Sequence, residues 1–226
     1  MAGSFLDEVV SKVLELTEDS HTQVRMATFK FLLNSTNFVQ AVQLLYHQRL
    51  VQVFCNALDN EQDLNVKYSG GISDCTEIWF YSLKEQAASA MHFFLQNTLP
   101  ESLTLNKYVD TVMGKFLPLL QDKESSKLKS IALSTLNITI QLCEEVAHKY
   151  CAIYRPMLLE ACNDENSNIR KEAARGIRIC AELGTPQLKP FINRILSKLI
   201  VLMNYSNQPQ NDEAFDIAVS VLGRIC

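Results

Sequence analysis

The chain has few of the residues that interrupt helices: its 226 residues include 7 glycines and 6 prolines. Tryptophan is also scarce, with a single residue. Glycine and proline mark turns and loops, so a chain with few of them is expected to form long regular elements with short connections. Hydrophobic residues make up 47% of the sequence. A chain of this length and composition can bury a sizeable continuous core.

The motifs that catalysis and nucleotide binding require are also missing. The sequence contains no Walker A motif, no GxGxxG and no GxSxG, so nucleotide-dependent and hydrolase functions lack their minimal patterns. The histidines lie far apart and form no HExxH pattern, which argues against a metal site; they are His21, His47, His92 and His148. We therefore expect a protein that is not an enzyme and that holds neither a metal nor a cofactor.

An excess of basic residues is absent as well. The formal net charge is −4 and the isoelectric point is about 5.6. A general nucleic-acid binder needs a basic face that displaces counterions from phosphates, so nucleic acid is not expected as a partner. A mild acidic excess suits basic protein ligands, although an ordinary solvated surface explains the same charge.

Signals for secretion, membrane insertion and disulfide bonding are lacking too. The N-terminus has no basic region followed by an apolar run, and no uncharged apolar stretch is long enough to cross a bilayer. The seven cysteines include no CxxC pair, and most fall where a helix would bury a small apolar side chain. The sequence therefore predicts a soluble intracellular chain with reduced core cysteines.

What the chain does contain is a weak recurring motif: an aliphatic residue, a basic residue, two variable positions and a small residue. It occurs at 24–28, 83–87, 128–132 and 169–173, and its basic residues are spaced 59, 45 and 41 residues apart. A period of about 40 to 47 residues is typical of HEAT and armadillo helical hairpins. We therefore predict an all-α fold, an α-α superhelix (HEAT/armadillo-like solenoid) of about five helical hairpins, built for protein binding.

The basic residues of the motif admit two interpretations: Arg25, Lys84, Lys129 and Arg170. They could form an anion-binding ladder, because equivalent positions of a solenoid align along one ridge. Alternatively, each bridges to an acidic residue in the preceding turn, since Asp19 with Arg25 and Asp164 with Arg170 share the same separation of six. We favour the second, structural interpretation.

The helical periodicity places the hairpins within a single domain that spans residues 1–226. The predicted repeats cover about 4–34, 37–97, 103–145, 148–183 and 187–226. The second repeat is too long by about 18 residues, and an inserted loop at 60–82, which carries Trp79 and Phe80, accounts for the excess. That loop is either a partner-binding element or a segment without a function of its own.

The sequence from Tyr150 onward carries a more specific signal. The informative runs are 154–158 (YRPML), 161–174 (ACNDENSNIRKEAA), 176–177, 180–182 and 214–226 (AFDIAVSVLGRIC). This part of the chain resembles the karyopherin-beta nuclear import receptors and, within them, the importin beta-3 class. The last run is most similar to the plant members, and the chain resembles a shortened member of the family.

The resemblance implies a function and a set of partners. Receptors of this family are long HEAT-repeat superhelices that carry cargo through nuclear pores and release it when the GTPase Ran binds. The resemblance therefore implies protein cargo with basic localisation signals, and a location in cytoplasm and nucleus. The similar segment corresponds to the C-terminal half of the family, whereas the principal Ran-binding repeats are N-terminal, so Ran and nucleoporins do not follow directly as partners.

In the resembled family the second helix of each hairpin forms the concave side, so we expect any ligand groove there. The candidate protein-binding residues are polar positions on those helices: Glu85, Asn137, Gln141, Glu144, Glu145, Glu172 and Asp216. Carboxylates there would meet lysine and arginine side chains of a ligand, and amides would fix its backbone. Two alternatives remain open: these are ordinary solvated faces, or the chain is a HEAT-repeat scaffold for a protein complex outside nuclear transport.

Overall fold

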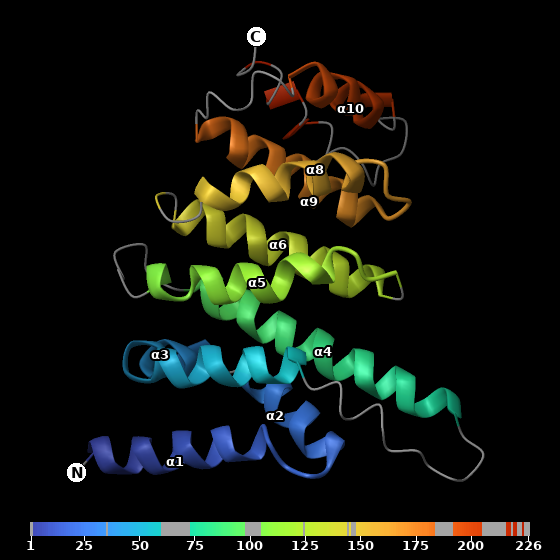
Figure 1. Cartoon of the computed structure of the whole chain (residues 1–226). Coiled ribbons are helices and arrows are strands. Elements are labelled where there is room, and N and C mark those ends of the chain that lie inside the picture. Colours follow the sequence, from blue (N-terminus) through green and yellow to red (C-terminus); the bar gives the residue numbers. More distant parts are fainter. Residues whose placement is uncertain are drawn as a thin grey trace. The chain divides into compact units, whose positions relative to one another are not determined.

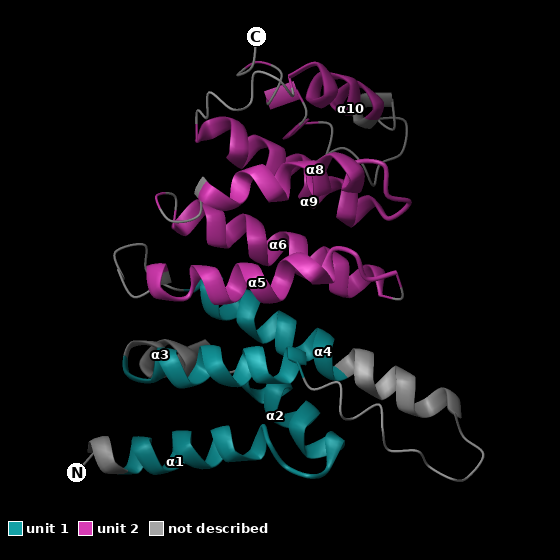
Figure 2. Cartoon of the chain, in the orientation of Figure 1, with its two compact units in different colours: residues 1–102 teal, residues 103–226 magenta. Residues whose placement is uncertain are grey.

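The computed structural model describes residues 2–34, 36–59, 73–97, 105–123, 125–143, 145, 148–183 and 192–204, and short pieces at 216–217, 219–220 and 223. Every regular element among these residues is a helix, and none is a strand (Figure 1). The predicted all-α fold class is thereby confirmed. The chain divides into two compact units, unit 1 at residues 1–102 and unit 2 at residues 103–226 (Figure 2). The sequence predicted one continuous domain. Because that depends on how the two units join, it stays a prediction.

Unit 1 contains four helices within its described residues. They are α1 (Ala2–Leu16), α2 (Thr22–Asn34), α3 (Thr36–Asp59) and α4 (Ser73–Gln96). Helix α4 packs along both α2 and α3, while α1 contacts α2 and α3. The first three helices lie where the apolar periodicity of the sequence places them. The start of α4 does not.

Helix α4 begins at Ser73, whereas the sequence pattern predicted a start near residue 83. The second half of the expected loop at 60–82 is therefore wrong, because residues 73–82 are helical. The physical reason is that 73–96 contains no glycine or proline, and aromatic residues have only a modestly lower helix propensity than leucine. Residues 60–72, and the side chains of Trp79 and Phe80, lie outside the described part of the chain.

The core of unit 1 is built on three phenylalanine rings, one from each of α2, α3 and α4. The ring centroids of Phe29 and Phe54 are 6.2 Å apart, as are those of Phe54 and Phe94. Both pairs are tilted, at 48° and 64°, which is the arrangement that aromatic quadrupoles favour. On α4, Ala87 and Ala88 are fully buried and let the helix approach its neighbours closely.

Unit 2 consists of paired helices, each pair preceded by a single 3-10 turn. The elements are η2 (Leu105–Lys107), α5 (Val109–Leu119), α6 (Ser126–Leu142), η3 (His148–Tyr150), α8 (Cys151–Ala161), α9 (Ser167–Glu182) and α10 (Ile192–Asn204). Helix α5 pairs with α6 and α8 with α9, while α6 also packs along α9. Pro118 and Pro156 lie inside α5 and α8, the first helices of their hairpins, as predicted.

The predicted fifth hairpin is described only in part. Helix α10 corresponds to its first helix and contacts α8 and α9. The expected second helix, at 212–226, falls mostly outside the described residues, apart from helical pieces such as 216–217 and 219–220. Within the described part of the chain, no helix combines the length and the apolar character that crossing a bilayer requires.

The cysteines that the structure describes agree with the predicted role as reduced core residues. Five of them are free and buried: Cys55, Cys143, Cys151, Cys162 and Cys180. Burial alone raises the pKa of the Cys143 thiol to about 11. It also raises the pKa of the Cys162 thiol to about 12, against a smaller opposing effect of Lys198. The side chains of Cys75 and Cys226 lie outside the described residues.

Candidate functional site

One second helix in each unit, α2 in unit 1 and α9 in unit 2, follows a turn that is held by an arginine. Arg25 donates from Nη1 to the main-chain carbonyls of Asp19 and Ser20, at 2.5 and 3.1 Å. In unit 2, Arg170 donates in the same way to the carbonyls of Asp164 and Glu165, at 2.8 and 2.7 Å. Each arginine thus contacts the predicted aspartate six residues before it, but at the main-chain carbonyl, whereas the prediction was a bridge to an acidic side chain. The acceptors are main-chain oxygens, so these arginines fix the shape of the turn.

The aspartates of these turns act on the backbone ahead of the next helix. In the turn between α5 and α6, Asp122 accepts the Ser125 N–H at 3.0 Å, and the Ser125 hydroxyl caps α6 by accepting the Leu128 N–H at 3.0 Å. In the turn between α8 and α9, Asp164 accepts the Asn166 N–H at 2.9 Å, and the Asn166 side chain accepts the N–H of Asn168. Side-chain oxygens satisfy N–H groups that a helix start leaves unpaired.

Neighbouring hairpins of unit 2 are joined by an ion pair at the same end. Lys129, in the first turn of α6, lies 2.6 Å from Asp164 Oδ2, and both side chains are about one-fifth exposed. Asp164 therefore serves three roles at once. One carboxylate oxygen binds the Asn166 N–H, the other binds Lys129, and its carbonyl accepts from Arg170.

The predicted candidate Asn137 lies at the centre of unit 2 and is fully buried. Its Oδ1 accepts from the Tyr154 hydroxyl of α8 at 2.8 Å, and its Nδ2 donates to the Glu172 carbonyl of α9 at 2.9 Å and to Glu172 Oε2 at 3.2 Å. Burial holds the pKa of Tyr154 well above its ordinary value, so the phenol stays a donor. Asn137 thus joins three helices and has no face toward a ligand.

A glycine makes this close packing possible. A Cβ atom at Gly176 on α9 would lie 2.5 Å from Leu158 Cδ2 and 2.6 Å from Asn137 Oδ1. Such distances fall inside van der Waals contact, so any side chain there would push α6 or α8 away. Gly176 is therefore part of the same junction as Asn137 and Tyr154.

The remaining predicted candidates are placed as follows. Glu85 is half-buried on α4 in unit 1, and in unit 2 Glu172 is half-buried on α9 and accepts from Asn137. Gln141 and Glu145 are exposed, near the end of α6 and just beyond it, and Asp216 is exposed in a short helical piece. Glu144 lies outside the described residues. The structure thus brings together Asn137 and Glu172, in a structural contact.

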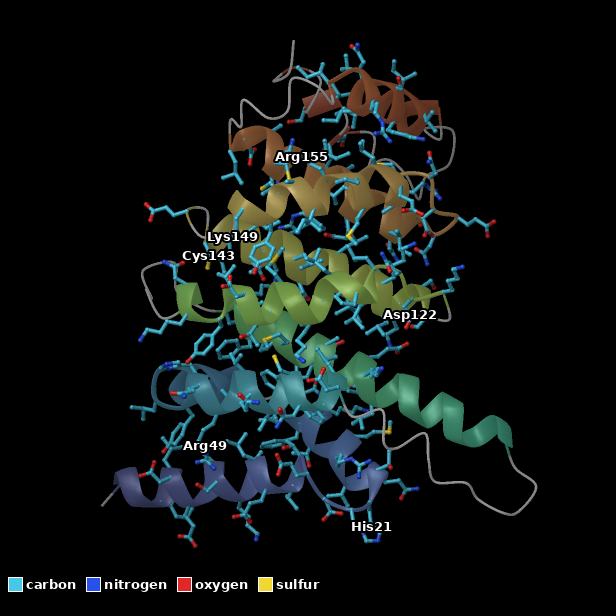
Figure 3. All side chains as sticks on the ribbon, viewed as in Figure 1. His21, Arg49, Asp122, Cys143, Lys149 and Arg155 are labelled. Carbon is cyan, nitrogen blue, oxygen red and sulfur yellow. The ribbon has the colours of Figure 1, made fainter. Side chains whose placement is uncertain are left out.

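A groove that sequence reasoning missed lies between the two turns of unit 2. It has a volume of about 700 Å³ and runs between the α5–α6 turn, marked by Asp122 in Figure 3, and the α8–α9 turn. Its acidic lining residues are Asp122, Glu160, Asp164 and Glu165, and its basic ones are Lys123 and Lys129. The sequence signal was available, because acidic and turn-forming residues cluster at 160–166, but we assigned the ligand surface to helix faces instead.

A second hollow, in unit 1, has the opposite character. It has a volume of about 510 Å³ and lies between α1 and α2. Leu16 and Phe31, which are 36% and 47% exposed, lie in its lining together with Val13, Val24 and Ala27. The lining is almost wholly apolar. Within the described residues, no group of three or more histidine, cysteine, aspartate or glutamate side chains is arranged to hold a metal ion.

The fold can now be compared with known proteins. Neither a family model nor a curated protein matches the sequence. Among solved structures, the crystal structure of Kap121p is similar to all of this chain (100%), with a TM-score of 0.71 and 19% sequence identity. The chain has a karyopherin-type helical fold. It spans 20% of the length of Kap121p.

Two further solved structures are similar to this chain. One is the karyopherin Kap121p bound to the SUMO protease Ulp1p, similar over 97% of this chain and 21% of its own length, with a TM-score of 0.71 and 16% identity. The other is an engineered protein, similar over 96% of this chain and 78% of its own length, with a TM-score of 0.61 and 14% identity. At these identities the likeness concerns the fold, and it supports the predicted HEAT-type repeat.

Proposed function

We propose that this chain is a protein-binding HEAT-repeat module of the karyopherin-beta type that takes part in nuclear import by binding basic cargo. The observation that carries the proposal is the likeness of the whole chain to Kap121p, at a TM-score of 0.71. The SUMO protease bound to the second Kap121p structure is a precedent for a protein ligand on this fold. Binding requires no catalytic group, so the module works without enzymatic activity.

The finer assignment is to the importin beta-3 class, with the plant members as the most similar. It rests on the sequence runs from Tyr150 onward. The runs within 154–182 form α8, α9 and the turn between them, whereas the run at 214–226, which carries the similarity to the plant members, lies mostly outside the described residues. The residues of those runs include the arginine that holds the turn, Arg170, and the glycine of the helix junction, Gly176. Under this assignment the protein moves between cytoplasm and nucleus, and Ran and nucleoporins are further proposed partners.

Binding to purified partners tests the proposal. The full chain is titrated against a fluorescent peptide with a basic localisation signal and against immobilised Ran loaded with GTP, at low and at physiological salt. We expect saturable peptide binding that weakens as salt rises, because exposed charge pairs are screened. Competition between the two ligands would support cargo release by Ran. A folded, monodisperse sample that binds neither ligand would refute the import function.

The apolar hollow between α1 and α2 favours a second candidate, a scaffold for a protein complex outside nuclear transport. Exposed apolar patches of this kind mark protein-protein contacts. Replacing Leu16 and Phe31 by serine should abolish capture of such a partner but leave binding of the basic peptide unchanged. Loss of peptide binding in this variant would instead assign the cargo site to unit 1. The exposed Leu45 offers a matched control substitution away from the hollow.

A further inference from the structure

We infer that the groove between the α5–α6 turn and the α8–α9 turn is a docking site for an extended protein segment rich in lysine and arginine. This inference deepens the proposed function and rests on it, since it names where on this chain a basic ligand binds. The two turns lie on the same side of unit 2 (Figure 1). The predicted site lay instead on the faces of the second helices.

The groove has an excess of negative charge. Lys129 is neutralised by Asp164 at 2.6 Å, so these two side chains cancel. Asp122 is engaged by the Ser125 N–H, so the charged lining that remains is Glu160 and Glu165 against Lys123, which leaves the groove negative. Glu160 and Glu165 are exposed, and within the described residues neither carboxylate makes a hydrogen bond or an ion pair. Their oxygens therefore point to a ligand that brings positive charge.

The floor of the groove is apolar. Leu120, Ala161 and Ile169 are buried among its lining residues, and Met157 is half-buried. Lysine and arginine have long aliphatic stems that pack on apolar surface while the charged end reaches a polar rim. An apolar floor with carboxylates at its edge matches both parts of such a side chain. A compact inorganic cation would use only the rim.

The second helices of unit 2 suit a basic ligand less well. Helix α9 carries Lys171, Arg175 and Arg178 at helical spacing, all of them partly exposed. Arg178 lies 4.0 Å from Glu182 Oε1, so these two charges partly cancel, but the face keeps more basic than acidic residues. Like charges placed opposite one another weaken association, so this face opposes a basic segment. The acidic residue between the basic ones, Glu172, is already engaged by Asn137. Within unit 2 the groove is therefore the better electrostatic partner.

The test compares charge-neutral variants of the full chain, using a short fluorescent peptide with several lysine and arginine residues at low salt. E160Q/E165Q removes both rim carboxylates, and E8Q/E18Q removes the same charge from exposed positions on α1 and its following turn. We expect Kd to rise about tenfold in E160Q/E165Q and to change less than about twofold in the control. K123Q, which removes the opposing charge, should lower Kd by about twofold.

The outcomes separate the groove from the proposed function. Equal peptide affinity in wild type and E160Q/E165Q would overturn the groove but leave basic-cargo binding in place. In that case E145Q/D216N, which neutralises two exposed candidates predicted from the sequence, should be the variant that loses affinity. If the wild-type chain does not bind the peptide at all, both the groove and the basic-cargo function are rejected. Circular dichroism of each variant confirms that it is folded, and the exposure of all these side chains makes misfolding an unimportant cause.

Discussion

Both units bury apolar side chains, but the contacts at the centre of each helix cluster differ. In unit 1, helices α2, α3 and α4 meet through the rings of Phe29, Phe54 and Phe94. In unit 2, helices α6, α8 and α9 meet through a hydrogen-bonded junction in which Asn137 links Tyr154 to Glu172. Apolar contact is non-directional, whereas hydrogen bonds demand particular geometry. The arginine-held turns are therefore common to the two units, whereas the contacts between helices differ from one unit to the other.

The largest loss of stability is expected when the central ring of unit 1 is removed. Phe54→Ala should lower the free energy of unfolding by about 3–5 kcal/mol, because it deletes both ring contacts and leaves a cavity. Urea denaturation measures the loss, and amide hydrogen exchange locates it. We expect faster exchange in α2, α3 and α4, with α6 and α9 unchanged. Phe31→Ala, at a ring that is 47% exposed, is the control and should cost much less.

The corresponding change in unit 2 adds one methyl group. Gly176→Ala should cost about 1–3 kcal/mol, because the new Cβ would fall 2.5 Å from Leu158 and 2.6 Å from Asn137. Gly114→Ala is the matched control in helix α5, since a Cβ there meets nothing within 4 Å. It should stabilise the helix by up to about 1 kcal/mol. Equal effects of the two substitutions would show that the junction tolerates expansion.

A smaller loss of stability is expected from changes to the turn arginine that both units contain. Arg25→Lys and Arg170→Lys should each cost about 1 kcal/mol, because an ammonium does not reproduce the planar guanidinium that binds two consecutive carbonyls. The losses should be similar in the two units, since the two main-chain contacts of each arginine are equivalent. Arg194→Lys, at an exposed position on α10, controls for the change of residue type. A loss in one unit alone would refute a common turn.

Much of the fold was predictable from the sequence, because apolar periodicity indicates where helices lie and an Asp–Arg separation of six marks the α1–α2 and α8–α9 turns. The start of α4 was not, since the aromatic run 79–81 resembles an irregular segment yet contains nothing that ends a helix. Boundaries depend on tertiary packing as well as on local propensity. The absence of a helix breaker would have been the better guide.

The site was harder to predict, and Asn137 shows why. On α6, Thr135, Asn137 and Thr139 are all buried, so polarity does not mark the exposed face of this helix. The two threonines bind carbonyls of their own helix, at Ile131 and Thr135, whereas Asn137 reaches other helices. Which polar residue finds a partner depends on the approach of α8 and α9. The distance between these helices cannot be read from a single sequence.

The smallest expected effect concerns the buried thiols of unit 2. The pKa of Cys162 is raised from 9.0 to about 12 by burial, so the folded state keeps a proton that the unfolded state loses first. Its contribution to stability is complete below pH 9 and is lost as the pH rises from about 9 toward 12. By pH 9 the loss should be under about 1 kcal/mol. Urea midpoints at pH 7, 8.5 and 9.5 measure it, and Cys162→Ala should flatten the slope. An unchanged slope in that variant would mean that other groups carry the alkaline loss, and the thiols would then add nothing to the difference between the units.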